Sequence, residues 1–262
     1  MLEVDIEYIK TVALEAGAKA LTMQQGMQSE LKADGSYVTD IDRAIENYVR
    51  GRLEERYPDF AFLGEEFGRH GDADAPLWAV DPIDGTTNMV FGLPQWGVSI
   101  GLIHEGKSVA GAFAMPRTQE LYWAELGKGA WRNGVKLEAK DRSAIHLEDT
   151  LGFTSAAIKH LDVSILPGRL RCLGSIAADI SYAASGTFCC LVGMREGAYD
   201  IAAALCCALE AGCVAQYLTG EPLNMNDIVR DARTSGPFVV APPQMAALIQ
   251  RLLAPTFHEG EA

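Results

Sequence analysis

The sequence predicts an α+β protein built on an antiparallel sheet, followed by a smaller part of α/β character. Two helical patterns precede a close succession of short strand-like segments. After about residue 150, strand-like and helical segments alternate instead. The chain has 262 residues, 48% of them hydrophobic, which is enough for a large core and leaves open one large domain or two intimate subdomains.

The first half is predicted to be a helix pair followed by the sheet. Residues 5–21 form the first predicted helix, and residues 40–56, with apolar side chains at helical spacing before Pro58, form the second. Asn133-Gly134 is typical of a type I′ hairpin turn. Short connections between the strands favour an antiparallel sheet with the helices on one face. The predicted strands are 60–64, 77–80, 97–103, 108–115 and 120–125.

In the second half, strand-like and helical segments alternate, and Gly212 is well placed to end the central helix. We therefore divide the chain into residues 1–150 and residues 151–262. No repeat or long linker separates these parts, so we expect them to pack as one unit with a cleft between them. The predicted strands are 170–174, 187–193, 213–218 and 236–243, and the predicted helices are 175–185, 200–212 and 244–253.

The composition excludes some classes of partner. A formal net charge of −13 argues against nucleic acid or an anionic membrane, since both need a basic surface. A small phosphate is still possible, because a bound metal reverses the sign of the local charge. The N-terminus lacks the layout of a secretory signal, and the longest uncharged run, residues 182–194, is too short to span a bilayer. We expect a soluble cytoplasmic protein.

The six cysteines show no C-x-x-C spacing, and two adjacent pairs, Cys189-Cys190 and Cys206-Cys207, lie in apolar runs. This arrangement favours buried, reduced thiols over a disulfide framework.

The stretch "DPIDGTTN" carries the clearest chemical signal. Asp81 and Asp84 lie at the end of an apolar strand, and Pro82 stiffens the bend between them. Two carboxylates that face one point repel each other, and a bound cation relieves the repulsion. All-oxygen ligation favours Mg²⁺, Ca²⁺ or Mn²⁺. Gly85 and the residues after it offer backbone N–H groups to an anion, although a plain capped turn explains the same residues equally well.

Three further acidic segments accompany this stretch. Glu65 and Glu66 follow the preceding strand, so one of them could reach the same point. Asp200 begins a predicted helix, and Asp42 lies at the start of another. For Asp200 and Asp42, ordinary helix capping is the alternative explanation.

In this order, "GEE", "DPIDGTTN" and "YDIAA" resemble the motifs of the inositol monophosphatase family, which contains metal-dependent, lithium-sensitive phosphatases. The resemblance covers about residues 5–253. It implies a layered α-β-α-β-α sandwich, a homodimer, and two or three Mg²⁺ ions that Mn²⁺ could replace. The implied metal ligands are Glu65, Asp81, Asp84, Asp200 and the backbone carbonyl of Ile83.

The same resemblance implies the remaining roles. Gly85 and Thr86 would hold the phosphate through backbone N–H groups, and Asp84 would also contact the substrate. Thr86, positioned with Asp42, and Glu65 would orient the attacking water, so these three are the candidate catalytic residues.

The substrate pocket departs from the family pattern. By position, Gly193 replaces a glutamate that contacts inositol hydroxyls, so a polyol contact is lost unless Arg195 or Glu196 compensates. Ser175, Ile176 and Asp179 are candidates for the pocket wall, and Asp179 could equally be packed inside a helix.

The leading hypothesis is a Mg²⁺-dependent phosphomonoesterase that acts on a small polyol, sugar or amino-alcohol phosphate, histidinol phosphate included. One alternative is the same chemistry on 3′-phosphoadenosine-type nucleotides. The other is a relative that binds metal without catalysis.

Overall fold

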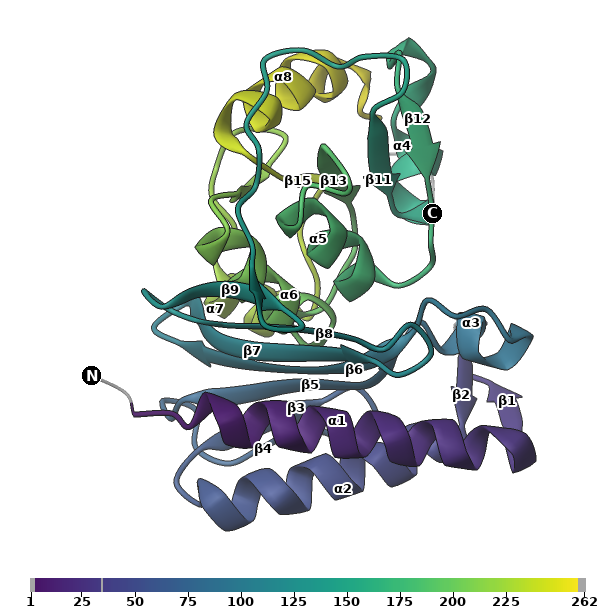
Figure 1. Ribbon diagram of the computed structural model, residues 1–262, viewed down its shortest axis with the longest axis vertical. Coiled ribbons are helices and arrows are strands. Elements are labelled where there is room, and N and C mark those ends of the chain that lie inside the picture. Colours follow the sequence, from purple (N-terminus) through teal and green to yellow (C-terminus); the bar gives the residue numbers. More distant parts are fainter. Residues whose placement is uncertain (1–2, 34, 259–262) are drawn as a thin grey trace.

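The computed structural model describes residues 3–33 and 35–258, which form five layers (Figure 1). Helices α1 (Ile6–Met23) and α2 (Asp40–Arg56) cover one face of an eight-stranded sheet. Helices α5 (Ile176–Ala184) and α6 (Ala198–Glu210) lie between this sheet and a five-stranded sheet, and α8 (Pro243–Leu253) lies on the far side of the second sheet. The predicted α-β-α-β-α layering is confirmed.

The eight-stranded sheet has the order β10-β9-β8-β7-β6-β5-β3-β4. Its strands are antiparallel except for β3 and β5, which are parallel, so the prediction of a wholly antiparallel sheet is wrong at this pair. The chain turns back after β3 to form β4 at the edge, and then returns to the other side of β3 as β5. The strands are β3 (Ala61–Gly64), β4 (Gly68–His70), β5 (Leu77–Asp84), β6 (Gly97–His104), β7 (Lys107–Met115), β8 (Glu120–Glu125), β9 (Gly129–Arg132) and β10 (Val135–Lys136).

The five-stranded sheet is mixed, in the order β12-β11-β13-β15-β14. Strand β11 runs parallel to both of its neighbours, and the pairs that involve β15 are antiparallel. The strands are β11 (Thr150–Phe153), β12 (Arg169–Arg171), β13 (Cys190–Gly193), β14 (Val214–Tyr217) and β15 (Phe238–Ala241).

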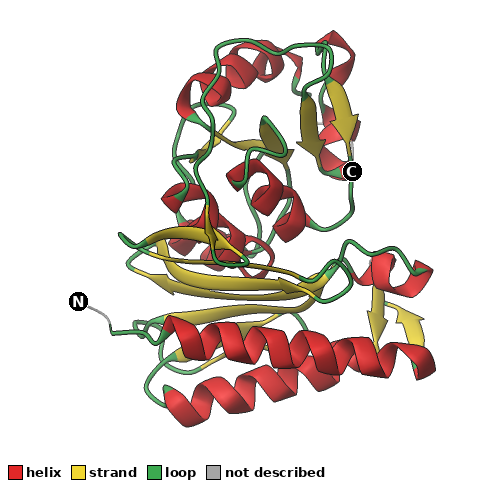
Figure 2. Ribbon diagram, viewed as in Figure 1, coloured by secondary structure: helices red, strands yellow, loops and turns green. Residues whose placement is uncertain are grey.

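Several short elements have no counterpart among the sequence predictions, and Figure 2 shows how much of the chain around them is loop. They are too short to produce a clear hydrophobic period. They comprise β1 (Ser29–Leu31) and β2 (Tyr37–Thr39), which pair with each other, the strands β4 and β11, helices α4 (Ser155–His160) and α7 (Met225–Asp231), and the 3₁₀ turns Gln24–Gly26, Val163–Ile165 and Ala254–Thr256.

Helix ends follow local chemistry. Thr39 caps α2 and accepts from the backbone N–H of Ile41 at 3.1 Å, while Asp42 accepts from the N–H of Thr39 at 2.8 Å. Gly212 follows α6 with φ +97°, a conformation that glycine adopts without strain. The predicted end of this helix is confirmed.

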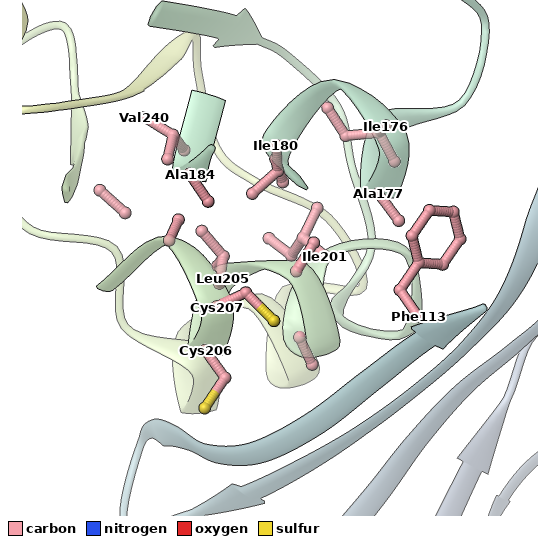
Figure 3. Close-up of a cluster of buried hydrophobic side chains, with 14 of the residues drawn as sticks. Phe113, Ile176, Ala177, Ile180, Ala184, Ile201, Leu205, Cys206, Cys207 and Val240 are labelled. Carbon is pink, nitrogen blue, oxygen red and sulfur yellow. The ribbon is translucent and has the colours of Figure 1, made fainter. Parts of the chain in front are cut away.

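One apolar core joins the two halves of the chain. Phe113 of β7 lies beside Ala177 of α5 (Figure 3). Ile180 of α5, Leu205 of α6 and Val240 of β15 belong to the same cluster, which therefore reaches the second sheet. The division at residue 150 separates the strands of the two sheets but crosses this shared core, and two separate domains remain a prediction.

Small residues let α6 approach the large sheet closely. A methyl group added at Gly101 would lie 2.6 Å from the backbone nitrogen of Ala203, and one added at Gly111 would lie 2.6 Å from the Cα of Ala203. The run Ala202-Ala203-Ala204 supplies the small side chains on the helix, and all three are fully buried.

Among the described residues, no helix combines the length and apolarity needed to cross a bilayer. The six cysteines are all free thiols; four are buried, Cys189 is partly buried and Cys172 is exposed. The prediction of reduced thiols is therefore confirmed, with Cys172 on the surface instead of in the core.

Gly111→Val should lower the free energy of unfolding by about 1–3 kcal/mol, because its side chain would overlap the backbone of α6. Urea denaturation measures the change. The control is Gly51→Ala in α2, where nothing lies within 4 Å of an added Cβ and the substitution should stabilise by about 0.5–1 kcal/mol. Wild-type stability in Gly111→Val would contradict the close approach of helix and sheet.

Candidate active site

A cavity of about 270 Å³ opens where β5 ends and where α5 and α6 begin. Its lining includes ten of the twelve predicted site residues, namely Glu65, Asp81, Ile83, Asp84, Gly85, Thr86, Ser175, Ile176, Asp179 and Asp200. The structure brings these residues together from both halves of the chain, and their chemical roles stay predictions. The other two, Asp42 and Gly193, do not line it.

The two aspartates of the "DPIDGTTN" stretch lie at an irregular strand end. Strand β5 extends through Asp84, four residues beyond its predicted end, and its register with β6 shifts between Asp81 and Asp84. Such a bulge turns side chains that simple alternation would separate. Both carboxyls are buried, and both line the cavity.

Asp84 does not cap the turn that follows it. Helix α3 (Thr86–Phe91) begins after Gly85, which has φ +89° and makes no side-chain cap. The carboxylate of Asp84 instead accepts from the start of α5: from the Ser175 hydroxyl, from the N–H of Ala177 at 2.9 Å and from the N–H of Ile176 at 3.2 Å. The plain capped turn is therefore not what these residues form.

Gly85 allows two loops to meet behind the cavity. A Cβ at this position would lie 2.9 Å from the carbonyl oxygen of Gln95. Asn88 then donates to the carbonyls of Gln95 and Leu173, at 2.5 and 2.7 Å. The turn after β5 is thus tied to the segment that leads into α5.

Thr86 and Asp42 meet across 44 residues of sequence. The Thr86 hydroxyl lies 3.0 Å from Oδ1 of Asp42 and 2.9 Å from the carbonyl oxygen of Ile83, so it can donate to either acceptor. Asp42 is buried directly behind Thr86. Burial raises the pKa of Asp42 to about 6, against the opposing effect of its hydrogen bonds from Thr39 and Thr86. The pairing that the resemblance implies is present.

Glu65 is held from two sides. The Lys32 ammonium group lies 2.9 Å from a carboxylate oxygen of Glu65 and 2.5 Å from one of Glu66. Beneath them, the buried carboxylate of Glu46 accepts from the N–H groups of Glu66 and Phe67 at 2.8 and 3.0 Å. Glu46 leaves no room for a side chain at Gly64, where a Cβ would lie 1.9 Å from its Oε1.

Sequence reasoning missed Glu46. The signal was available, because Glu46 lies one turn after Asp42 on the apolar face of α2, where Ile45 and Val49 are fully buried. A carboxylate on such a face needs donors from elsewhere in the fold.

Asp200 both caps a helix and lines the cavity, so helix capping does not exclude it from the site. It accepts from the N–H of Gly197 at 2.6 Å and so caps α6, and it also lines the cavity. Capping orients this carboxylate and does not remove it from the site.

The lining also contains two acids outside the implied metal set, Asp179 of α5 and Glu196 of the turn before α6. Asp179 is only 1% exposed, which answers the question of its position: it is packed in the helix and still reaches the cavity wall. Burial raises the pKa of both carboxyls to about 8, and the nearby charge of Asp84 adds to the effect.

An aromatic ring fills the space beside Gly193. Gly193 pairs with Phe238 of β15, and a Cβ at Gly193 would lie 2.5 Å from the tip of that ring. Gly193 does not line the cavity, and Phe238 occupies the space that a side chain would need there. The role of this position in substrate binding stays a prediction.

The cavity concentrates negative charge. Burial, and then repulsion from the neighbouring carboxylates, raises the pKa of Asp81 and Asp200 well above the usual range, and burial raises that of Asp84 to about 7. None of the described lining residues is Lys, Arg or His. The oxygen donors Glu65, Asp81, Asp84, Asp200 and the carbonyl of Ile83 fit a hard divalent cation. Within the described ranges, however, no three acidic, His or Cys side chains form a ready-made metal cluster.

Without metal, the protein should become less stable as the pH rises from about 4 to about 8. Over this interval the unfolded chain ionises at ordinary carboxyl pKa values, whereas Asp84, Asp179 and Glu196 keep their protons in the folded state. Mg²⁺ should therefore raise the melting temperature more at pH 8 than at pH 5.5, because it binds the ionised form. Scanning fluorimetry with EDTA or Mg²⁺ measures both effects, and an equal rise at the two pH values would contradict the prediction.

Comparison with known proteins agrees with this geometry. The sequence model of the inositol monophosphatase family matches residues 1–256. A fructose-1,6-bisphosphatase/inositol-1-monophosphatase of Aquifex aeolicus is 30% identical over 248 residues, which is 90% of this chain and 93% of that protein. The Nus factor SuhB of Pasteurella multocida is 29% identical over 252 residues, 92% of this chain and 91% of that protein. The solved IMPase of Thermotoga maritima superimposes with a TM-score of 0.83 at 25% identity, covering 94% of this chain and 95% of that one. The chain belongs to the inositol monophosphatase family.

Proposed function

We propose that the protein is a Mg²⁺-dependent phosphomonoesterase that hydrolyses a small phosphate ester. The observation that carries the proposal is the meeting of Glu65, Asp81, Asp84 and Asp200 in one cavity, beside the hydrogen-bonded pair of Thr86 and Asp42. Membership of a generally metal-dependent phosphatase family supports it.

In this proposal the four carboxylates and the carbonyl of Ile83 hold the metal ions, and Mn²⁺ could replace Mg²⁺ because both accept oxygen ligands. When bound, the metal lowers the pKa of water and neutralises charge on the phosphoryl oxygens. The carboxylates are held in place before a metal arrives, since Asp84 and Asp200 each accept backbone hydrogen bonds.

Residues of the turn after β5 are proposed to bind the phosphate and to relay the proton of the attacking water. Thr86 donates its hydroxyl proton to Asp42 or to the carbonyl of Ile83, so a lone pair of its oxygen can accept from the attacking water. Asp42, with its pKa near 6, is suited to take up the proton that Thr86 relays. Gly85 and Thr86 line the side of the cavity where their backbone N–H groups would receive the phosphate.

A phosphate-release assay with Mg²⁺ tests the reaction and the substrate together. Inositol 1-phosphate, histidinol phosphate, fructose 1,6-bisphosphate and 3′-phosphoadenosine 5′-phosphate form the panel. Turnover of any of the first three esters supports the proposed function. Turnover of 3′-phosphoadenosine 5′-phosphate alone would support the alternative, in which the substrate is a nucleotide. If the whole panel released no phosphate, the non-catalytic alternative would replace the proposal.

Asp81→Asn should lower kcat/KM at least about 10²-fold on the best substrate, because it removes one charged ligand from the metal site. Asp81 is a better choice than Asp84, whose carboxylate also caps α5, whereas Asp81 accepts only from the N–H of Ile83 within the described residues. The control is Asp59→Asn on the exposed surface. Near-normal activity of Asp81→Asn would rule out its role as a ligand.

Thr86→Val should lower kcat about 10²–10⁴-fold, because the isosteric side chain cannot accept from water or relay its proton to Asp42. Thr86→Ser retains the hydroxyl and should stay within about tenfold of the wild type. Steady-state kinetics compare the two variants. Equal activity of the valine and serine variants would remove Thr86 from the reaction.

A further inference from the structure

Two further acidic residues of the lining, Asp179 and Glu196, are here called the second acidic wall of the cavity. Asp179 projects from the first turn of α5, and Glu196 comes from the turn that precedes α6. Both line the cavity, and neither belongs to the residues proposed above to hold metal. The metal proposal therefore leaves two carboxyl groups of the site without a function.

One carboxyl oxygen of Asp179 lacks a hydrogen-bond partner within the described part of the chain, although the backbone of Leu173 bonds to the carboxyl group. Its side chain is 1% exposed, and its Oδ1 has no hydrogen-bond partner among the described residues. A buried carboxyl oxygen without a donor is unfavourable, so such groups nearly always find a hydrogen-bond partner. Since Asp179 lines the cavity, the donor that is missing from the protein can come from the cavity's occupant.

Glu196 is held firmly in its position. The hydroxyl oxygen of Thr234 accepts from the N–H groups of Arg195 and Glu196 at 3.0 and 3.2 Å, and the N–H of Thr234 donates to the carbonyl of Glu196 at 2.9 Å. Arg195 adopts φ +68° at this turn, a conformation that these bonds support. The Glu196 carboxylate is therefore presented to the cavity by a braced turn.

Little positive charge balances this wall. Burial raises the pKa of Asp179, and the nearby charges of Asp84 and Glu196 add to the rise. Arg233 opposes the charge of Glu196, but its guanidinium donates to the carbonyl of Arg195 at 3.3 Å, and Arg233 is not part of the described lining.

These observations decide what kind of group fits beside the phosphate. A hydroxyl group can donate one hydrogen bond but brings no positive charge that would favour the ionised form of either carboxyl. An ammonium group donates three hydrogen bonds and brings a compensating charge. The polyol contact that a side chain at position 193 would supply is absent, because Phe238 fills its place.

We propose that Asp179 and Glu196 form a subsite for an ammonium group, so that the preferred substrate is a phosphate monoester that also carries a primary amine. This inference rests on the proposed function, because the phosphate end of the ester occupies the metal side of the same cavity. The amine end lies against α5 and the turn before α6.

Two matched esters test the subsite. One is glycerol 1-phosphate, and the other is its analogue in which a primary amine, protonated at pH 7, replaces the C2 hydroxyl. With Mg²⁺ present, kcat/KM for the amine ester should exceed that for glycerol 1-phosphate by about 10–100-fold, as expected for charge-assisted hydrogen bonds. Asp179→Asn and Glu196→Gln should each reduce this ratio about tenfold or more, whereas the exposed control Asp59→Asn should leave it unchanged.

Equal kcat/KM for the two esters, or an unchanged ratio in both variants, would overturn the subsite while leaving the phosphatase intact. Absence of phosphate release from both esters and from the earlier panel would overturn the proposed function instead. In that case calorimetric binding of the two esters to the Mg²⁺-loaded protein decides the subsite. Tighter binding of the amine ester that Asp179→Asn abolishes would support it, and equal binding would reject it.

Discussion

The site depends on the contact between the Asp84 carboxylate and the first residues of α5. It links a strand of the large sheet to a helix 91 residues later in the chain, through the Ser175 hydroxyl and two backbone N–H groups. A helix start carries unsatisfied N–H groups and a partial positive charge, so a buried carboxylate is stabilised there. The cavity lies where these two halves of the chain meet, and its lining includes acidic residues from both.

Accumulated negative charge is the main energetic consequence of this arrangement. Each carboxyl around the cavity is placed by a local hydrogen bond, such as that from Gly197 to Asp200 or from Ile83 to Asp81. Burial raises the pKa of Asp81, Asp84 and Asp200, and repulsion among the carboxylates adds to the rise. The hydrogen bonds to Asp84 and Asp200 oppose only part of it. A cation and a positively charged ligand group would both relieve the repulsion, which connects the proposed reaction to the proposed substrate class.

Positioning reaches beyond the groups that line the cavity. Helix α2 contributes Asp42 behind Thr86 and Glu46 behind Glu65, one turn apart on the same buried face. A single helix thus supports both the residue proposed to orient water and a proposed metal ligand. On the opposite side, the glycines of β6 and β7 let α6 approach the sheet, which brings Asp200 to the same point.

Much of the fold could be predicted because long elements leave a strong period in the sequence. Helix α2 has its predicted bounds, and α6, β6, β7 and β8 lie where their patterns placed them. Strand β11 and the parallel pairing of β3 with β5 could not be predicted, since short strands have weak patterns and pairing joins residues that are distant in sequence. Reasoning by aligned position identified a lost polyol contact at Gly193, but only the fold showed that Phe238 fills the space of a side chain there.

The sequence by itself determined the layered fold class and the set of carboxylates, because hydrophobic period and a dense local motif are both properties of neighbouring residues. Tertiary structure alone decided which helix Asp84 caps, that Glu46 supports the Glu65 turn, and that Asp179 and Glu196 form a second acidic wall. The physical reason is common to all three. A buried carboxyl takes its function from the donors and charges around it, and in this protein these come from segments that meet only when the chain folds.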